Sequence, residues 1–162
     1  MFKNFQLNIK IYPLLGNHDY GCGLKGVLAQ IDYSKKSKYW NMPSRYYTIN
    51  SKNYELIILD TEVLAHDQAQ RKWIDLLLSK KTNKWRVILA HHPIYANGGH
   101  GDNTYLIDNL LPKLCHNIDA YITGHEHNLQ HLRTECGLNL YISGAAGKVR
   151  STFYGEHTIF AK

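Results

Sequence analysis

The sequence lacks several features that would place it in a special class of protein. No run of about 18 apolar residues occurs among its 162 residues, which excludes a membrane-spanning helix. Its opening, Met1-Phe2-Lys3-Asn4, does not begin a signal-peptide pattern. No period repeats, and no linker rich in Pro, Gly or Ser divides the chain. We therefore expect one soluble domain, or part of one.

Cysteine is scarce, and its spacing excludes the usual zinc motifs. The three cysteines, Cys22, Cys115 and Cys136, form no CxxC pair. Because their number is odd, at least one thiol is free or pairs outside the chain. A disulfide between two of them and the alternative, small buried apolar side chains, both remain open.

Acidic residues are fewer than basic ones. Nineteen Lys and Arg against thirteen Asp and Glu give a formal charge of +6, which favours anionic partners such as phosphate esters. The basic residues are scattered along the sequence, so no nucleic-acid partner is expected. Apolar residues make up 44% of the chain and can furnish a folded core.

The apolar pattern predicts strands that alternate with helices, an α/β arrangement in which loops at strand ends carry the chemistry. A run that ends at Gly16 predicts a buried strand over 9–15. Asp67 is predicted to cap a helix over 68–79, and Pro112 to kink or restart one over 105–114. The other predicted elements are a helix over 24–33, a hairpin of strands 46–49 and 56–59 with its turn at 51–53, and strands over 85–90, 120–123 and 138–143.

Histidine is abundant and clustered. Six of the ten histidines fall in three short loops that each follow an apolar, strand-like run. The loops are Gly16-Asn17-His18-Asp19-Tyr20, Ala90-His91-His92-Pro93 with His100 shortly after, and Gly124-His125-Glu126-His127-Asn128.

These loops carry a set of side chains that suits a metal ion. His125 and His127 are two residues apart, so on an extended segment they point the same way. Imidazoles bind Zn, Fe or Mn, and the amide oxygen of Asn17 is a hard ligand that can complete such a shell. Each motif alone is more often a turn or a structural histidine. Their joint occurrence in this order favours a metal site.

The order of the three motifs resembles that of the calcineurin-like metallophosphoesterases, and further stretches are similar to the purple (tartrate-resistant) acid phosphatase branch. Those stretches are Ala29-Gln30-Ile31-Asp32-Tyr33-Ser34, Tyr39-Trp40-Asn41-Met42-Pro43, Gln68-Ala69-Gln70 and residues 124–132. The resemblance implies a partial αββα sandwich, with mixed β-sheets flanked by helices. It also implies hydrolysis of phosphate monoesters by a hydroxide that two metal ions, Fe with Fe, Zn or Mn, activate.

Residue roles follow from the resemblance by motif position. Asn17, His91 and His125 would bind the second metal, and His127 the first. His18 would stabilise the phosphoryl oxygens or protonate the leaving group.

The remaining roles are supporting ones. Asp19 would orient His18 through a charge-assisted hydrogen bond, and His100 would bind substrate or donate a proton. His92 would be structural or lie behind the ligands, and Glu126 would point away. For Asp60, a solvated or capping carboxylate is expected.

The sequence departs from the family pattern upstream of Gly16. The family begins with an aspartate-bearing strand and a Gly-Asp-x-x-Tyr segment that bridges the metals, and neither motif is found. We therefore expect residues 1–162 to be a single domain that is incomplete at its N-terminus and at its C-terminus. One metal or none is expected in this chain, with apolar sheet faces left exposed. A longer parent protein would be secreted, periplasmic or lysosomal.

Four functions remain open from the sequence. The first is an acid phosphatase that acts on phosphate monoesters, and the second is a phosphodiesterase of the same superfamily. The third is a non-catalytic remnant that binds a metal or a phosphate-bearing partner, and the fourth is a basic nucleic-acid binder. No residue pattern indicates an oligomeric state.

Overall fold

The structure of the chain is a computed structural model, and it describes residues 8–162. It contains a seven-stranded mixed sheet with the order β1-β2-β3-β4-β6-β5-β7. Strands β2, β3, β4 and β6 are parallel, while β1, β5 and β7 pair antiparallel with their neighbours. The strands are β1 (Tyr47–Asn50), β2 (Tyr54–Ile58), β3 (Trp85–Leu89), β4 (Ala120–Thr123), β5 (Leu129–Arg133), β6 (Asn139–Ser143) and β7 (Thr158–Ala161).

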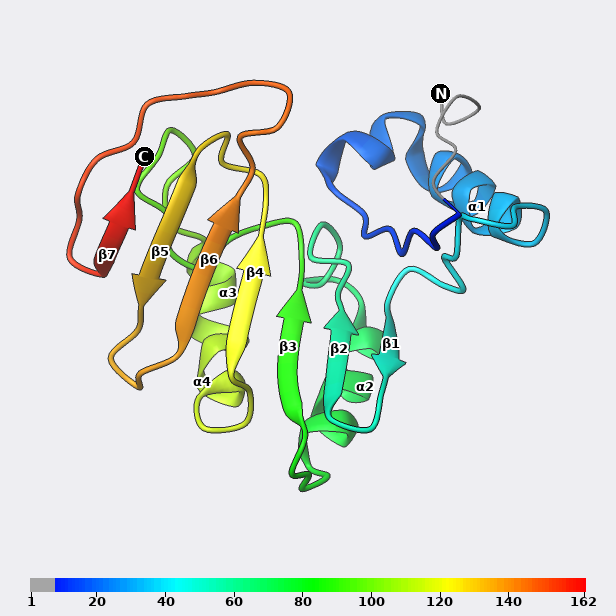
Figure 1. Cartoon of the computed structure of the whole chain (residues 1–162), viewed down its shortest axis with the longest axis horizontal. Coiled ribbons are helices and arrows are strands. Elements are labelled where there is room, and N and C mark those ends of the chain that lie inside the picture. Colours follow the sequence, from blue (N-terminus) through cyan, green and yellow to red (C-terminus); the bar gives the residue numbers. More distant parts are fainter. Residues whose placement is uncertain (1–7) are drawn as a thin grey trace.

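Helices cover one face of this sheet and lie beyond one of its ends (Figure 1). They are the 3-10 helix η1 (Asn17–Cys22), α1 (Gly23–Ser34), α2 (Gln68–Leu78), α3 (Thr104–Asn109) and α4 (Leu111–Leu114). Helices α2, α3 and α4 pack behind the sheet, whereas α1 lies beyond the carboxyl ends of β2 and β3. The predicted fold class, an α/β protein with a mixed sheet flanked by helices, is confirmed.

The helix ends follow the predicted signals. The Asp67 side chain caps α2 by accepting from the backbone N–H of Gln70 at 2.9 Å. The predicted helix over 105–114 is broken at Leu110, and Pro112 lies in the first turn of α4, where its missing N–H costs nothing. The hairpin of β1 and β2 and the helix α1 are also confirmed. Strands β5 and β7 were not predicted.

The main core lies between the sheet and helices α2 to α4. Alternate strand residues such as Ile88, Tyr121 and Leu140 point into it, and they pack with Ile74 and Leu114 from the helices. Each fully buried aliphatic side chain contributes about 2 kcal/mol relative to exposure. This core fixes β3 and β4, whose carboxyl ends carry two of the histidine loops.

The opposite sheet face is partly open in the described residues. Tyr141, His131 and Phe160 face one another across β6, β5 and β7, and the rings of His131 and Tyr141 stack at 4.5 Å. Tyr141 is 37% exposed and Phe160 is 45% exposed. The sheet therefore presents an aromatic row that the helices do not cover.

Residues 8–43, which we call the N-terminal region, pack against the sheet through a second, smaller core. Leu15, Val27 and Met42 contact Tyr47 and Ile58 of residues 44–162, which we call the sheet region.

The predicted strand over 9–15 is wrong. Its only ladder contact is a single bridge between Ile11 and Trp40, and Ile9 is 57% exposed. An apolar run forms a strand only where a neighbouring strand completes its hydrogen bonds, and no described strand lies beside this run.

One disulfide closes the sheet region. Cys115, directly after α4, is bonded to Cys136 in the turn between β5 and β6, with their Cα atoms 5.9 Å apart. Cys22 is free and exposed. The expectation of at least one unpaired thiol is therefore confirmed, and of the alternatives left open for the other two cysteines the disulfide is the one formed.

Candidate metal and catalytic site

Three of the predicted metal ligands converge where the two regions meet. The Nε2 atom of His91 lies 2.9 Å from Oδ1 of Asn17 and 3.0 Å from Nδ1 of His125. Asn17 opens η1, His91 follows β3 and His125 follows β4. We call these three atoms the donor set.

Local backbone geometry makes this approach possible. His125 has φ of +64°, a left-handed conformation, and it directly follows Gly124. A Cβ atom on Gly16 would lie 2.7 Å from Nδ1 of His91, so only glycine fits there. Gly16, which leaves room for the His91 ring, and His125, with its left-handed backbone, thus allow the side chains of Asn17, His91 and His125 to approach one another.

The imidazoles of the donor set are neutral over a wide pH range. Burial, together with the neighbouring His92, lowers the pKa of His91 to about 4. Burial and the neighbouring His91 lower the pKa of His125 to about 4 as well. Neutral rings keep a lone pair, which is the form that binds a metal.

A bound cation would satisfy the three atoms of the donor set better than hydrogen bonds among them do. A neutral His91 ring carries one proton. With that proton on Nδ1, the lone pair of Nε2 faces the oxygen of Asn17, and with it on Nε2, one N–H is shared between two partners. Ligand atoms about 2.1 Å from one ion and at right angles to each other lie about 3 Å apart, close to the two distances measured from Nε2 of His91. A set of two imidazole nitrogens and one amide oxygen suits Zn, Fe or Mn.

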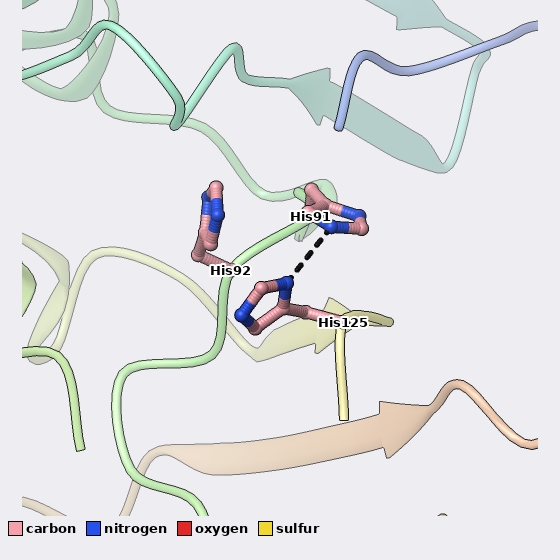
Figure 2. Close-up of side chains that lie close together, drawn as sticks. All are labelled: His91, His92 and His125. Carbon is pink, nitrogen blue, oxygen red and sulfur yellow. Dashed lines mark hydrogen bonds between the residues drawn. The ribbon is translucent and has the colours of Figure 1, made fainter. Parts of the chain in front are cut away.

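His92 lies beside the donor set but is held by other partners. Its Nδ1 is 2.9 Å from Oγ1 of Thr61, and its Nε2 is 3.5 Å from a carboxylate oxygen of Glu62. Its ring stands 4.5 Å from that of His125, so His91, His92 and His125 form a close histidine trio (Figure 2). The supporting position expected for His92 stays a prediction, in keeping with its bond to Thr61.

The expected hydrogen bond from Asp19 to His18 is not formed. The Asp19 carboxylate instead accepts from the backbone N–H of Gly16 and from the Gln30 side chain, both at 2.8 Å. It therefore stabilises the start of η1, where an acidic side chain satisfies free N–H groups. Within residues 8–162, the His18 ring forms no hydrogen bond. Its charge nevertheless contributes to lowering the pKa of His91.

His100 is held at the site by Glu126, which the sequence predicted to point away. Its ring lies 4.2 Å from that of His125. Oε1 of Glu126 accepts from the backbone N–H of His100 at 2.6 Å and lies 3.1 Å from its Nδ1. Glu126 is fully buried and points at His100, so the expectation that it points away is wrong.

His127 lies outside the donor set. Among the described residues, no hydrogen bond or ring contact joins it to Asn17, His91 or His125, and its buried Nδ1 has no partner. Three of the four predicted ligands thus contact one another, whereas His127, predicted for the other metal, follows two residues after His125.

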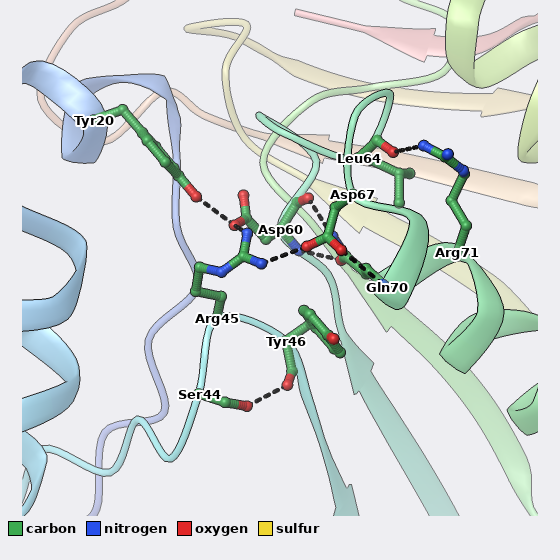
Figure 3. A network of polar contacts seen from close by, with 9 residues as sticks. All are labelled: Tyr20, Ser44, Arg45, Tyr46, Asp60, Leu64, Asp67, Gln70 and Arg71. Carbon is green, nitrogen blue, oxygen red and sulfur yellow. Dashed lines mark hydrogen bonds and ion pairs between the residues drawn. The ribbon is translucent and has the colours of Figure 1, made fainter. Parts of the chain in front are cut away.

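A polar network joins the N-terminal region to the sheet region, and we call it the polar joint (Figure 3). The Tyr20 hydroxyl donates to the Asp60 carboxylate at 2.5 Å, and Arg45 pairs with Asp60 at 3.0 Å and also with Asp67. Asp60 is fully buried, and burial raises the pKa of its carboxyl. The expected solvated or capping role of Asp60 is therefore wrong, because its charge is paired inside the protein.

Neither Glu126 nor Arg45 carried a usable signal in the sequence. The position of Glu126 between two candidate ligands hints at the site but does not reveal its partner. Arg45 is 15 residues from Asp60 and 22 from Asp67, distances along the chain that only the fold closes.

Comparison with known proteins agrees with the geometry of the site. The chain matches the calcineurin-like phosphoesterase family over residues 1–129 and belongs to that family. It is similar to tartrate-resistant acid phosphatase type 5 of Sus scrofa, with 34% identity over 85% of this chain and 47% of that protein. It is also similar to purple acid phosphatase 7 of Arabidopsis thaliana, with 28% identity over 85% of this chain and 48% of that protein.

Solved structures share the fold. Purple acid phosphatase PPD1 from yellow lupin seeds has a TM-score of 0.66 at 18% identity, and the match covers 96% of this chain and 33% of that one. GAP50, the anchor in the inner membrane complex of Plasmodium, has a TM-score of 0.74 at 20% identity, with 97% and 57% covered. The chain spans about half the length of the curated relatives it matches. Within residues 8–162, no helix combines the length and apolarity needed to cross a membrane.

Proposed function

We propose that this chain carries the metal-binding and substrate-binding side of an acid phosphatase that hydrolyses phosphate monoesters. The observation that supports the proposal most is that Asn17 Oδ1 and His125 Nδ1 both lie within 3.0 Å of Nε2 of His91. Membership of a metal-dependent phosphoesterase family points to the same chemistry.

The donor set would hold the metal. When bound, such an ion neutralises phosphoryl charge and lowers the pKa of water, so that a nucleophilic hydroxide is available at low pH. The neutral state of His91 and His125 down to about pH 4 keeps the donor set competent under acidic conditions.

Two further histidines would act on the substrate. His18 has no hydrogen bond in the described part of the chain, so its ring is available to a phosphoryl oxygen or a leaving group. His100 is held by Glu126 through Nδ1, with its ring 4.2 Å from that of His125, so it would lie beside a substrate bound at the donor set.

The number of metals separates two versions of the proposal. A dinuclear centre of Fe with Fe, Zn or Mn would need His127 and further ligands at a second position. The donor set by itself supports the alternative, a chain that holds one metal and has impaired turnover or only binds phosphate.

Metal content and turnover test the proposal together. The 162-residue chain is loaded with Zn, Mn or Fe, and metal per chain is measured by inductively coupled plasma mass spectrometry. Turnover of p-nitrophenyl phosphate is compared with that of its bis-ester. We expect one or two metals per chain and faster turnover of the monoester than of the bis-ester. The metal should be lost in His91→Asn and kept in the control variant His131→Gln.

Other outcomes contradict specific parts. Absence of bound metal in the unaltered chain would refute the metal site. Faster turnover of the bis-ester would favour a phosphodiesterase. One metal without turnover would favour the binding-only alternative.

The cellular compartment follows from the disulfide. A bond between Cys115 and Cys136 persists in an oxidising environment, so we propose that the protein works outside the cytosol, in a secreted, periplasmic or lysosomal setting.

A further inference from the structure

We propose that Arg150 binds an anionic group on the leaving-group side of the substrate, so that the site favours phosphate esters whose leaving group carries a carboxylate or a second phosphate. This inference rests on the proposed function, because it takes the donor set as the place where the phosphoryl group binds.

The position of Arg150 carries the inference. One guanidinium nitrogen, Nη1, lies 3.2 Å from Nε2 of His100, and the His100 ring lies 4.2 Å from that of His125. The guanidinium therefore contacts the His100 ring, and the His100 ring lies beside His125 of the donor set. A group that reaches His100 Nε2 from the donor set comes within reach of Arg150.

The tautomer of His100 follows from its two neighbours. Glu126 accepts a hydrogen bond at Nδ1, and Arg150 can only donate at Nε2, because a guanidinium has no acceptor. His100 is thus held with its proton on Nδ1 and its lone pair toward Arg150. Glu126 is sealed inside the protein, so its carboxylate holds His100 and does not reach the guanidinium.

The charge of Arg150 has no counterion in the structure. Among residues 8–162, Arg150 forms no ion pair with a carboxylate, although a guanidinium is always ionised. Only one of its five N–H donors faces His100. The remaining donors form a planar fork that matches the oxygens of a carboxylate or phosphate.

The backbone keeps Arg150 at this place. Its N–H donates to the carbonyl oxygen of His127 at 2.8 Å. A Cβ atom on Gly144 would lie 1.9 Å from the carbonyl oxygen of Glu126, so the segment after β6 approaches the site loop as closely as a backbone can. The loop that carries Arg150 is therefore held at two points, His127 and Glu126, of the loop that follows β4.

Binding of two matched probes tests the inference. Ethyl phosphate and phosphoglycolate differ by one carboxylate, and their affinities are measured by titration calorimetry with the zinc-loaded chain. Phosphoglycolate should bind more tightly. Arg150→Gln should weaken phosphoglycolate about 10-fold and change ethyl phosphate less than about 2-fold, since a charge-assisted hydrogen bond is lost only with the former.

Control variants sharpen the result. Arg150→Lys should retain part of the preference, because it keeps the charge and loses the fork. Arg133→Gln, which removes an exposed arginine on β5, should change neither affinity. An unfolding transition unchanged from that of the original chain would show that Arg150→Gln still folds.

Two results would overturn the inference. Equal weakening of both probes in Arg150→Gln would place Arg150 on the transferred phosphoryl group instead. Unchanged binding of both probes, or no preference in the original chain, would remove Arg150 from the site.

Repeating the titration after metal removal separates this inference from the proposed function. An Arg150-dependent preference that survives without metal, in a chain that shows no phosphatase turnover, would uphold Arg150 and reject the phosphatase.

Discussion

The two regions that supply the candidate site are held in the molecule by different forces. The main core of the sheet region contains 18 buried residues. The N-terminal region, by contrast, contributes three buried residues to the second core, Leu15, Val27 and Met42, with partly buried side chains such as Trp40 packed against them. Polar contacts also attach it, among them the Tyr20 hydroxyl on Asp60 and the contact between Asn17 and His91. Because apolar burial scales with area, the N-terminal region should open at a lower free energy than the sheet region.

This difference matters for function because each region brings part of the site. His91 and His125 sit at the ends of strands that the main core fixes. Asn17 and His18 belong to the N-terminal region, which should open more readily. A metal bound to Asn17 and His91 together would tie the two regions, as any ligand that binds only the folded state stabilises it.

Acidification should have the largest effect on stability, because three histidines act together. The pKa values of His91, His92 and His125 are lowered from 6.5 to about 4. Between these pH values the unfolded chain binds more protons than the folded one. The free energy of unfolding of the metal-free chain should thus fall as the pH drops from about 6.5 to about 4, and these groups should not change it above 6.5. Urea titrations at several pH values measure this.

A variant of one histidine separates this cause from others. His125→Asn should flatten the dependence of stability on pH between 6.5 and 4, because one titrating ring is gone. A slope as steep as that of the original chain would contradict the assignment.

Removal of Arg45 should have the next largest effect, at the polar joint. Arg45→Ala leaves the buried carboxylate of Asp60 without its counterion, and we expect a loss of about 3 kcal/mol in the free energy of unfolding. Hydrogen exchange should increase first in α1 and only later in β3. Arg133→Ala, a change at an exposed position, serves as the control. An equal increase of the hydrogen-exchange rate in α1 and β3 would mean that the two regions open as one unit.

Removal of His18 should lower turnover without loss of metal. His18→Ala should reduce phosphatase turnover about 100-fold or more, as expected for a residue in acid–base catalysis. Metal per chain should stay unchanged, because His18 is not in the donor set. Turnover within a few-fold of the original value in an active protein would reject this role.

The smallest effect is expected for the residue that positions His100. Glu126→Gln keeps the shape of the side chain but removes the charge beside Nδ1, and kcat/KM should fall about 10-fold with a shift of the pH profile. Glu135→Gln, a change at an exposed carboxylate, should leave both unchanged. A normal pH profile in Glu126→Gln would leave Glu126 with a packing role only.

Much of the sheet region could be predicted from the sequence. The cap at Asp67, the break near Pro112 and the hairpin turn at 51–53 are local signals that act within a few residues. The predicted strands before His91 and before His125 are also confirmed, since each is a mainly apolar run. Strand β5 escaped prediction because Gln130 and His131 interrupt its apolar pattern, and β7 is a run of only four residues.

The predictions that failed are those that depend on distant neighbours. The run over 9–15 has the composition of a strand, but no described strand lies beside it. Asp60 was expected to be solvated or to cap a helix, and Glu126 to point away from the site, yet both carboxylates are buried on partners far away in the chain.

The sequence by itself determined the family, the order of the motifs and which residue types stand at the strand ends, because these depend on local pattern alone. Only the tertiary structure decided which of those residues meet. It brought Asn17 and His125 within hydrogen-bond distance of His91 and placed His100 between Glu126 and Arg150. The reason is physical: these contacts connect residues that are 26 to 74 positions apart along the chain, and sheet packing, which no local signal encodes, brings them together.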